Sequence, residues 1–249
     1  MLLLATICPP AQPYQSGSVP AGPLPSAEHL SYKIEWRLVT AGRAQLHWTH
    51  SAGPDGGLFH AGLQLESTGL VSKLFKVNDE YGSTLDRNLC ATNSLFTSHE
   101  GSRHRETRVV FHSEHRKANY VERDTARNAV LDTRETDILP CVSDVVGALY
   151  RMRTVNLEPG QTTQIPISDG KKTALARLDS ISRETVKTPA GSYKTIRYEA
   201  FLFNDVIYRR SGRLYIWLTD DRRRLPVQIQ VRLHLAIGTI TLQLEKEGT

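Results

Sequence analysis

Cysteine is scarce in this chain: three occur among 249 residues, and no two of them form a CxxC pair. Thioredoxin-type redox sites and zinc knuckles need that spacing, so the sequence supports neither. The motifs GxSxG, GxxxxGK[ST], GxGxxG and HExxH are also absent. These are the usual signatures of hydrolases, NTPases, dinucleotide enzymes and zinc proteases. The sequence therefore predicts no catalytic residue, no cofactor and no metal ligand.

Histidine is the residue type that still leaves a metal hypothesis open. His99, His104, His112 and His115 lie in one stretch, but HEGSRH is one residue longer than HExxH and the local pattern is typical of strands. On paired strands such side chains can converge on an ion. The interpretation we favour is four scattered histidines that face solvent or accept hydrogen bonds.

The net charge of the chain is also small, at +5. A dedicated nucleic-acid binder carries a clustered basic stripe, so nucleic acid is not an expected partner. Short basic segments occur at residues 103–108, 151–153, 208–210 and 222–224. If they share a surface, they favour a lipid headgroup or another anionic component of a cell envelope.

Long apolar runs are missing after the first residues. The run that begins the chain is stopped by Pro9 and Pro10 and is too short to span a bilayer. It resembles the end of a signal peptide, although the basic n-region is lacking. We expect residues 1–12 to be a signal-peptide remnant, residues 13–30 to be a flexible Pro/Gly/Ser-rich segment, and the protein to be exported to the periplasm or cell envelope.

Two cysteines remain once such a leader is removed. An exported chain with Cys90 and Cys141 favours a disulfide between them, since export leads to an oxidising compartment. The alternative is two buried free thiols. A bond would hold the start of the helix expected at residues 142–153 against the first run of strands.

Alternation of apolar and polar residues is the dominant pattern from Ser31 onward. It predicts strands near residues 32–38, 44–48, 59–67, 78–85, 106–112 and 117–123, and again from residue 164 to residue 245. Helical spacing predicts one clear helix at 142–153, with Ser143 as its N-cap. The sequence thus predicts a mainly β fold: a curved antiparallel sheet, an open or partly closed barrel-like meander, with one central α-helix. Residues 31–247 are expected to form a single domain.

Asp220 and Asp221 are the most conspicuous acids, because they stand beside three consecutive arginines. Adjacent carboxylates can perform acid-base chemistry if burial separates their pKa values. Here Trp217 ends one alternating run and Pro226 begins the next, so we interpret the segment as a hairpin turn. Residues 213–218 should then pair with residues 227–232.

Several segments, taken in order, resemble one family. They are LSYKIEWRLVTAGRAQL (30–46), SDVVGALYRMR (143–153), DGKK (169–172), TPAGSYKTIRYE (188–199) and WLTDDRRRLPVQIQV (217–231). Together they resemble the bacterial envelope family known as domain of unknown function 3108. The resemblance implies a secreted or periplasmic β-rich protein and one domain over both runs of strands. It implies no catalytic residue.

Three functions remain open at this level. The leading hypothesis is a non-catalytic exported envelope protein that binds a lipid or other amphipathic ligand on its curved sheet. One alternative is an envelope enzyme that acts on a glycan or ester, with histidines and acids brought together from separate strands. The other is a fully packed structural or interaction module, which a core filled by Trp36, Trp48 and Trp217 would favour.

Overall fold

The protein is almost entirely β-sheet in the computed structural model, which describes residues 21–37, 39–53, 57–233 and 238–248. Within these residues, fourteen strands form one antiparallel sheet. The first eight strands are β1 (Ala27–Trp36), β2 (Val39–Ser51), β3 (Leu58–Ser67), β4 (Val77–Leu85), β5 (Ala91–Glu100), β6 (Arg103–His112), β7 (Lys117–Asp124) and β8 (Ala129–Asp137). The other six are β9 (Thr162–Ser168), β10 (Thr173–Thr188), β11 (Gly191–Ala200), β12 (Gly212–Thr219), β13 (Pro226–Leu233) and β14 (Thr239–Gly248). The helices are α1 (Gly69–Leu74) and α2 (Val145–Arg153).

Strand order in the sheet follows the sequence within each run, and β1 pairs with β14 to join the two runs. In that pairing Ile34 lies opposite Leu242. The strands β8 and β9 are the two edges, so the sheet is not closed. The predicted barrel-like meander is therefore confirmed in its open form.

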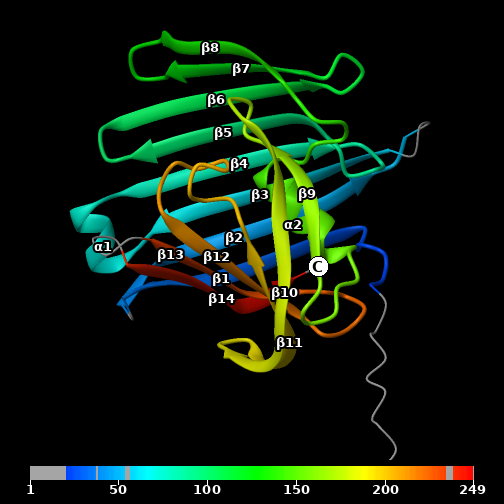
Figure 1. Cartoon of the computed structure of the whole chain (residues 1–249). Helices are drawn as coiled ribbons and strands as arrows, with labels where there is room; N and C mark the ends of the chain where they lie inside the picture. Colours follow the sequence, from blue (N-terminus) through cyan, green and yellow to red (C-terminus); the bar gives the residue numbers. More distant parts are fainter. Residues whose placement is uncertain (1–20, 38, 54–56, 234–237, 249) are drawn as a thin grey trace, which may run out of the picture.

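The sheet curls around α2 (Figure 1). Strands β9 and β10 cross in front of the first run, and α2 lies between the two layers. The β9–β10 turn reaches across to β7 and β8, where Lys171 Nζ lies 3.1 Å from Glu122 and 3.3 Å from Asp132. The same ammonium group lies 4.4 Å from the centre of the Tyr120 ring. Side-chain contacts, rather than a ladder of backbone hydrogen bonds, thus hold this part of the barrel-like shape together.

The core fills the space between the curled sheet and α2. Trp48 is fully buried and stacks between Phe59 and Tyr150, at ring-centre distances of 4.8 and 4.2 Å. Trp217 is buried as well, whereas Trp36 is only half-buried at the end of β1. Because α2 is covered on several sides, its buried residues lie on more than one face of the helix. They are Val146, Gly147, Ala148, Tyr150, Met152 and Arg153.

Several boundaries differ from those that the pattern predicted. β1 begins at Ala27, and residues of the preceding segment are already hydrogen-bonded: Trp48 Nε1 donates to the carbonyl of Pro25 at 2.9 Å. The N-cap of α2 is Asp144, because Ser143 forms an isolated bridge with Ile167 of β9. The predicted leader, residues 1–12, and residues 13–20 lie outside the described residues.

Candidate functional site

The C-terminal end of α2 carries a buried ion pair. Arg153 donates from Nη1 and Nη2 to the two carboxylate oxygens of Glu28, at 2.6 and 2.9 Å. The side chains are 1% and 8% exposed. Arg153 Nη2 also donates to the carbonyl of Arg223 at 3.2 Å, while its Nε has no hydrogen-bond partner among the described residues. Burying two charged groups costs desolvation free energy. The two parallel hydrogen bonds between the guanidinium and the carboxylate offset this cost.

A cavity of about 370 Å³ lies beside this ion pair. Glu28 and Arg153 form part of its wall, and Arg223 and Glu247 form a second, more exposed ion pair on the same wall. The remaining lining is mostly apolar. The lining residues are Pro23, Pro25, Ala27, Glu28, Leu30, Arg153, Arg223, Glu247 and Gly248. We call this the α2-end cavity; its volume lies within the range of small-molecule sites.

Two buried tyrosines flank the ion pair. Tyr32 donates its hydroxyl to the carbonyl of Pro226 at 2.7 Å, and Tyr150 lies on α2 one turn before Arg153, whose guanidinium carbon lies 5.2 Å from the centre of the Tyr150 ring. Burial raises the pKa of both phenols well above the ordinary value. Both therefore stay neutral, so they contribute shape and polarity to the region without adding charge.

The opposite end of α2 is fixed by a disulfide. Cys90 and Cys141 are bonded, with their Cα atoms 4.6 Å apart, as the sequence predicted. Arg151 reinforces this connection, because its Nη2 donates to the carbonyl of Leu89 at 2.8 Å. Of the basic segment 151–153, neither arginine thus contributes to an open basic surface.

Asp144 caps α2 from a fully buried position. Its Oδ1 accepts the backbone N–H of Gly147 at 2.6 Å, and Oδ2 has no hydrogen-bond partner among the described residues. Burial raises the pKa of this carboxyl to about 6, against the opposing influence of Ser83 and Tyr81 beside it. The helix is thus capped by a group whose charge is costly to bury.

This burial predicts an unusual dependence of stability on pH. The folded protein binds a proton at Asp144 more readily than the unfolded chain does, so this group lowers the free energy of unfolding as pH rises from about 4 to about 6. Asp144→Asn keeps a cap acceptor and removes the titration. We expect the free energy of unfolding of the variant to be roughly 3 kcal/mol higher than that of the wild type above pH 6. This difference should vanish near pH 4. Urea melts over this pH range measure it, and a difference that does not change with pH would contradict it.

The segment 220–225 is a turn between β12 and β13. Strand residues 213–218 and 226–232 pair as antiparallel neighbours, and Pro226 is the first residue of the returning strand. Trp217 donates from Nε1 to Glu184 at 2.7 Å and lies beside Tyr215, with ring centres 6.2 Å apart. The predicted pairing is therefore present.

The two acids of this turn make structural contacts. Asp221 Oδ1 accepts the N–H of Arg223 at 2.9 Å, while Asp220 Oδ2 lies 2.8 Å from Arg183 Nε. Arg224 at the tip is buried, with a positive φ of 48°, and its Nη1 lies 3.6 Å from Asp220. Asp220 and Asp221 thus organise the turn that carries Arg223 to the cavity wall.

The four clustered histidines do not converge. His99 and His104 face each other across β5 and β6, with ring centres 4.9 Å apart. His112 lies 3.3 Å from the amide of Asn119, and His115 is exposed in the next turn. Within the described ranges no group of three or more His, Cys, Asp or Glu side chains is arranged to hold a metal ion. Nor does any described helix have the length and apolar character needed to cross a membrane.

The chain matches a model of a protein family. The model described as a protein of unknown function, DUF3108, matches residues 31–245, as the sequence motifs indicated. None of the curated proteins matches this chain.

Comparison with solved structures gives matches at low sequence identity. A beta-barrel-like DUF1849 protein from Brucella abortus has a TM-score of 0.56 at 8% identity, over 89% of this chain and 97% of that chain. A presumed exported protein with a YmcC-like fold from Bacteroides fragilis has a TM-score of 0.38 at 13% identity, over 93% and 100% of the two chains. A presumed lipoprotein from Parabacteroides distasonis has a TM-score of 0.35 at 10% identity, over 94% and 100%. Only the first of these likenesses is strong enough to support the fold.

Proposed function

This chain belongs to the DUF3108 family, and we propose that it is a non-catalytic exported protein of the bacterial envelope that holds one amphipathic molecule in the α2-end cavity. The observation that carries the proposal is the composition of the cavity wall. Apolar residues stand beside two ion pairs, one of them fully buried. Pockets that bind small molecules combine an apolar lining with a few fixed polar groups in this way.

The wall also favours a particular kind of headgroup. Arg153 and Arg223 offer N–H donors, while Glu28 and Glu247 offer carboxylate oxygens, so the four charges sum to zero. A purely anionic or purely cationic group would meet like charge on part of the wall. A headgroup that carries one positive and one negative charge matches it. The apolar part of such a molecule would lie against Pro23, Pro25 and Leu30.

The position of the proposed ligand differs from the first expectation. A ligand between the sheet and the helix would need space that α2, Trp48 and Trp217 occupy. A filled interior is what the alternative of a fully packed structural or interaction module would also have. The α2-end cavity offers space at the end of the barrel-like sheet, and we therefore place the ligand there.

Export rests on two observations. The first residues resemble a signal-peptide remnant, and the Cys90–Cys141 bond is typical of an oxidising compartment. In a bacterium that compartment is the periplasm or the outer envelope.

The test is to identify small molecules that copurify with the protein from its native envelope. We expect one amphipathic species per protein in the wild type. Ala27→Phe obstructs the cavity with an aromatic ring and should abolish copurification, whereas Arg223→Gln removes one donor and should reduce it about tenfold. Mass spectrometry of solvent extracts measures the ratio of ligand to protein.

Two matched variants serve as controls. Ala129→Phe adds the same side chain at an exposed alanine that begins β8, and Arg222→Gln changes the neighbouring arginine of the same turn, which does not line the cavity. Both should retain the ligand. A wild type with no stoichiometric ligand, or equal loss in the control variants, would contradict the proposal.

A further inference from the structure

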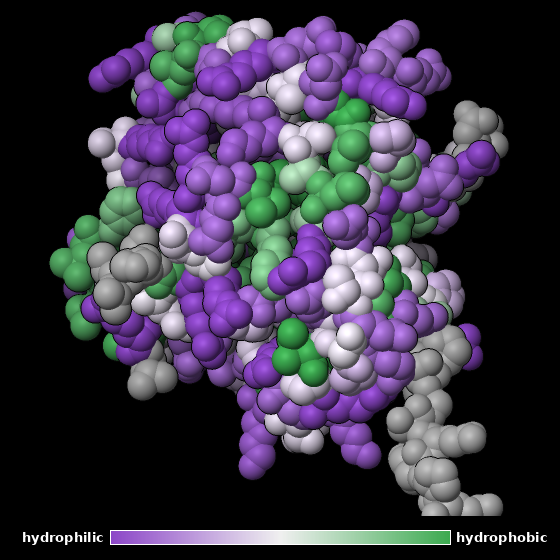
Figure 2. Space-filling view, viewed as in Figure 1, coloured by the Kyte–Doolittle hydropathy of each residue, from purple (hydrophilic) through white to green (hydrophobic). Residues whose placement is uncertain are grey.

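Helix α1 presents an exposed apolar surface at the end of the sheet that lies away from the α2-end cavity. None of its residues is buried. Leu70 is 72% exposed, Leu74 is 85% exposed and Phe75, which follows the helix, is 53% exposed. Figure 2 shows apolar residues at the left edge of the molecule, where Figure 1 places α1. A turn of helix that buries nothing contributes little to the core, so these large side chains need another explanation.

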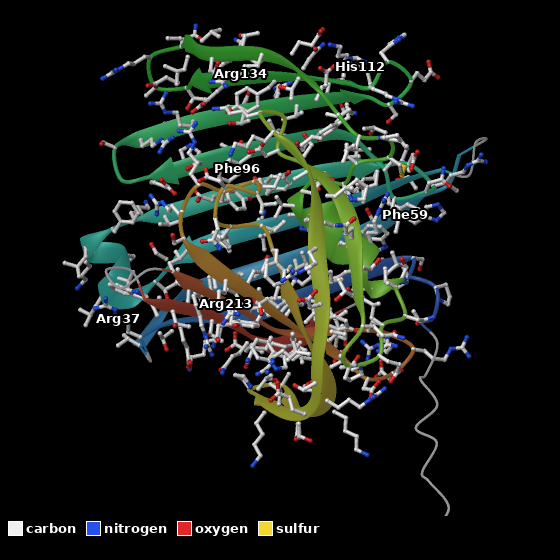
Figure 3. The ribbon with its side chains drawn as sticks, viewed as in Figure 1. Arg37, Phe59, Phe96, His112, Arg134 and Arg213 are labelled. Carbon is white, nitrogen blue, oxygen red and sulfur yellow. A yellow bond between two sulfur atoms is a disulfide. The ribbon has the colours of Figure 1, made fainter. Side chains whose placement is uncertain are left out.

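Cations surround this apolar surface. Lys73 and Lys76 are exposed and form no ion pair within the part of the chain that the structure describes. Arg37 lies at the same end (Figure 3). Two acids, Glu66 and Glu100, also belong to the strand ends here. Arg103 at this end lies 3.8 Å from Glu122, so the positive charge next to the apolar surface comes mainly from Lys73 and Lys76.

A second cavity, of about 330 Å³, lies beside Lys76, two residues beyond the end of α1. Its side chains come from the end of the α1 segment and from the facing positions of β4, β5 and β6, where Asn78 lies opposite His99 and His99 opposite His104. The N–H of Gly101 donates to the carbonyl of Lys76 at 2.9 Å and thereby ties the two parts together. The lining contains no carboxylate: it consists of Lys76, Asn78, His99, Gly101 and His104.

We propose that this end of the protein docks on an anionic membrane surface, with Leu70, Leu74 and Phe75 in the interfacial layer and a lipid phosphate in the cavity beside them. Apolar side chains flanked by lysines suit the boundary between headgroups and acyl chains. Lys76, Asn78 and the two imidazoles supply hydrogen-bond donors that an anionic phosphate accepts. An inserting surface beside a donor-lined cavity favours a membrane over a protein partner.

The docking surface is separate from the α2-end cavity. That cavity is lined by the first residues of β1, whereas α1 contacts β2, whose first residues pair with the last residues of β1. The two sites therefore lie at opposite ends of β1. Vesicle binding and ligand copurification can fail independently of each other.

The experiment is cosedimentation of the full chain with vesicles of phosphatidylglycerol and phosphatidylcholine, or of phosphatidylcholine alone. Leu74→Ser and Phe75→Ser should each lower the partition coefficient on the mixed vesicles about tenfold. Lys76→Gln should lower it about fivefold and His99→Gln about threefold. Because every variant keeps the same N-terminal residues, differences among them report on the docking surface.

Each variant has a matched control. Val130→Ser changes an apolar residue of β8 that is 55% exposed, Lys187→Gln an exposed lysine of β10, and His115→Gln an exposed histidine. All three should partition like the wild type. Equal sedimentation with phosphatidylcholine alone, unchanged partition of the α1 variants, or an α1 effect confined to self-association would overturn the proposal.

Discussion

Replacing both Cys90 and Cys141 by alanine is expected to lower the free energy of unfolding by about 4 kcal/mol. The bond joins residues 51 apart in sequence, so its removal frees a long loop in the unfolded chain. It also connects the β4–β5 turn to the segment that leads into α2. In the variant, hydrogen exchange of the backbone amides should therefore become faster in α2, and more so there than in the rest of the protein.

Urea melts of the oxidised wild type and the double variant measure this effect. Adding a reductant should bring the wild type to the stability of the variant and leave the variant unchanged. If both proteins unfold at the same urea concentration, the disulfide does not stabilise the helix against the sheet and the prediction is wrong.

Breaking the buried ion pair should have an effect of similar size. Arg153→Met leaves Glu28 charged, buried and without its partner, and we expect a loss of about 3 to 5 kcal/mol. The double variant Glu28→Leu/Arg153→Met removes both charges and should recover most of that loss, because the pair then costs no desolvation. Denaturant melts of Arg153→Met, Glu28→Leu and the double variant measure the coupling energy between the two side chains.

An exposed pair provides the comparison. Arg134→Met makes the same change on β8, where the arginine side chain is 54% exposed and contacts Asp132 (Figure 3). The expected loss is below about 1 kcal/mol, since water screens the pair. Equal losses at Arg153 and Arg134 would mean that the α2-end pair is not buried in solution.

The strand pattern of the sequence predicted much of this fold, for a reason visible in β2. Ala44, Leu46 and Trp48 face the core while Gln45 faces water, and such alternation is recorded directly in the residue types. The edge strand β8 was missed because nearly all of its residues are exposed on both faces, which erases the alternation. Strand β5 was missed because its inward positions include Ser94 and Ser98, small polar residues that resemble a loop.

The α2-end cavity depends on contacts that no local pattern records. Glu28 lay in a segment interpreted as flexible, and Arg153 was counted with surface arginines; their pairing spans 125 residues. One signal was available. Arg153 follows Val146 and Tyr150 at helical spacing, which places it on the buried face of α2. A charged residue at a buried position predicts a partner, although it does not identify Glu28.

A crystal structure of the protein purified from its native envelope without detergent exchange tests most directly whether the α2-end cavity holds a ligand. We expect density for one elongated molecule in this cavity, with its headgroup of mixed charge beside Arg153, Arg223, Glu28 and Glu247 and its apolar part along Leu30. Ordered water alone in that cavity, or a ligand inside the sheet in the place of α2, would contradict it.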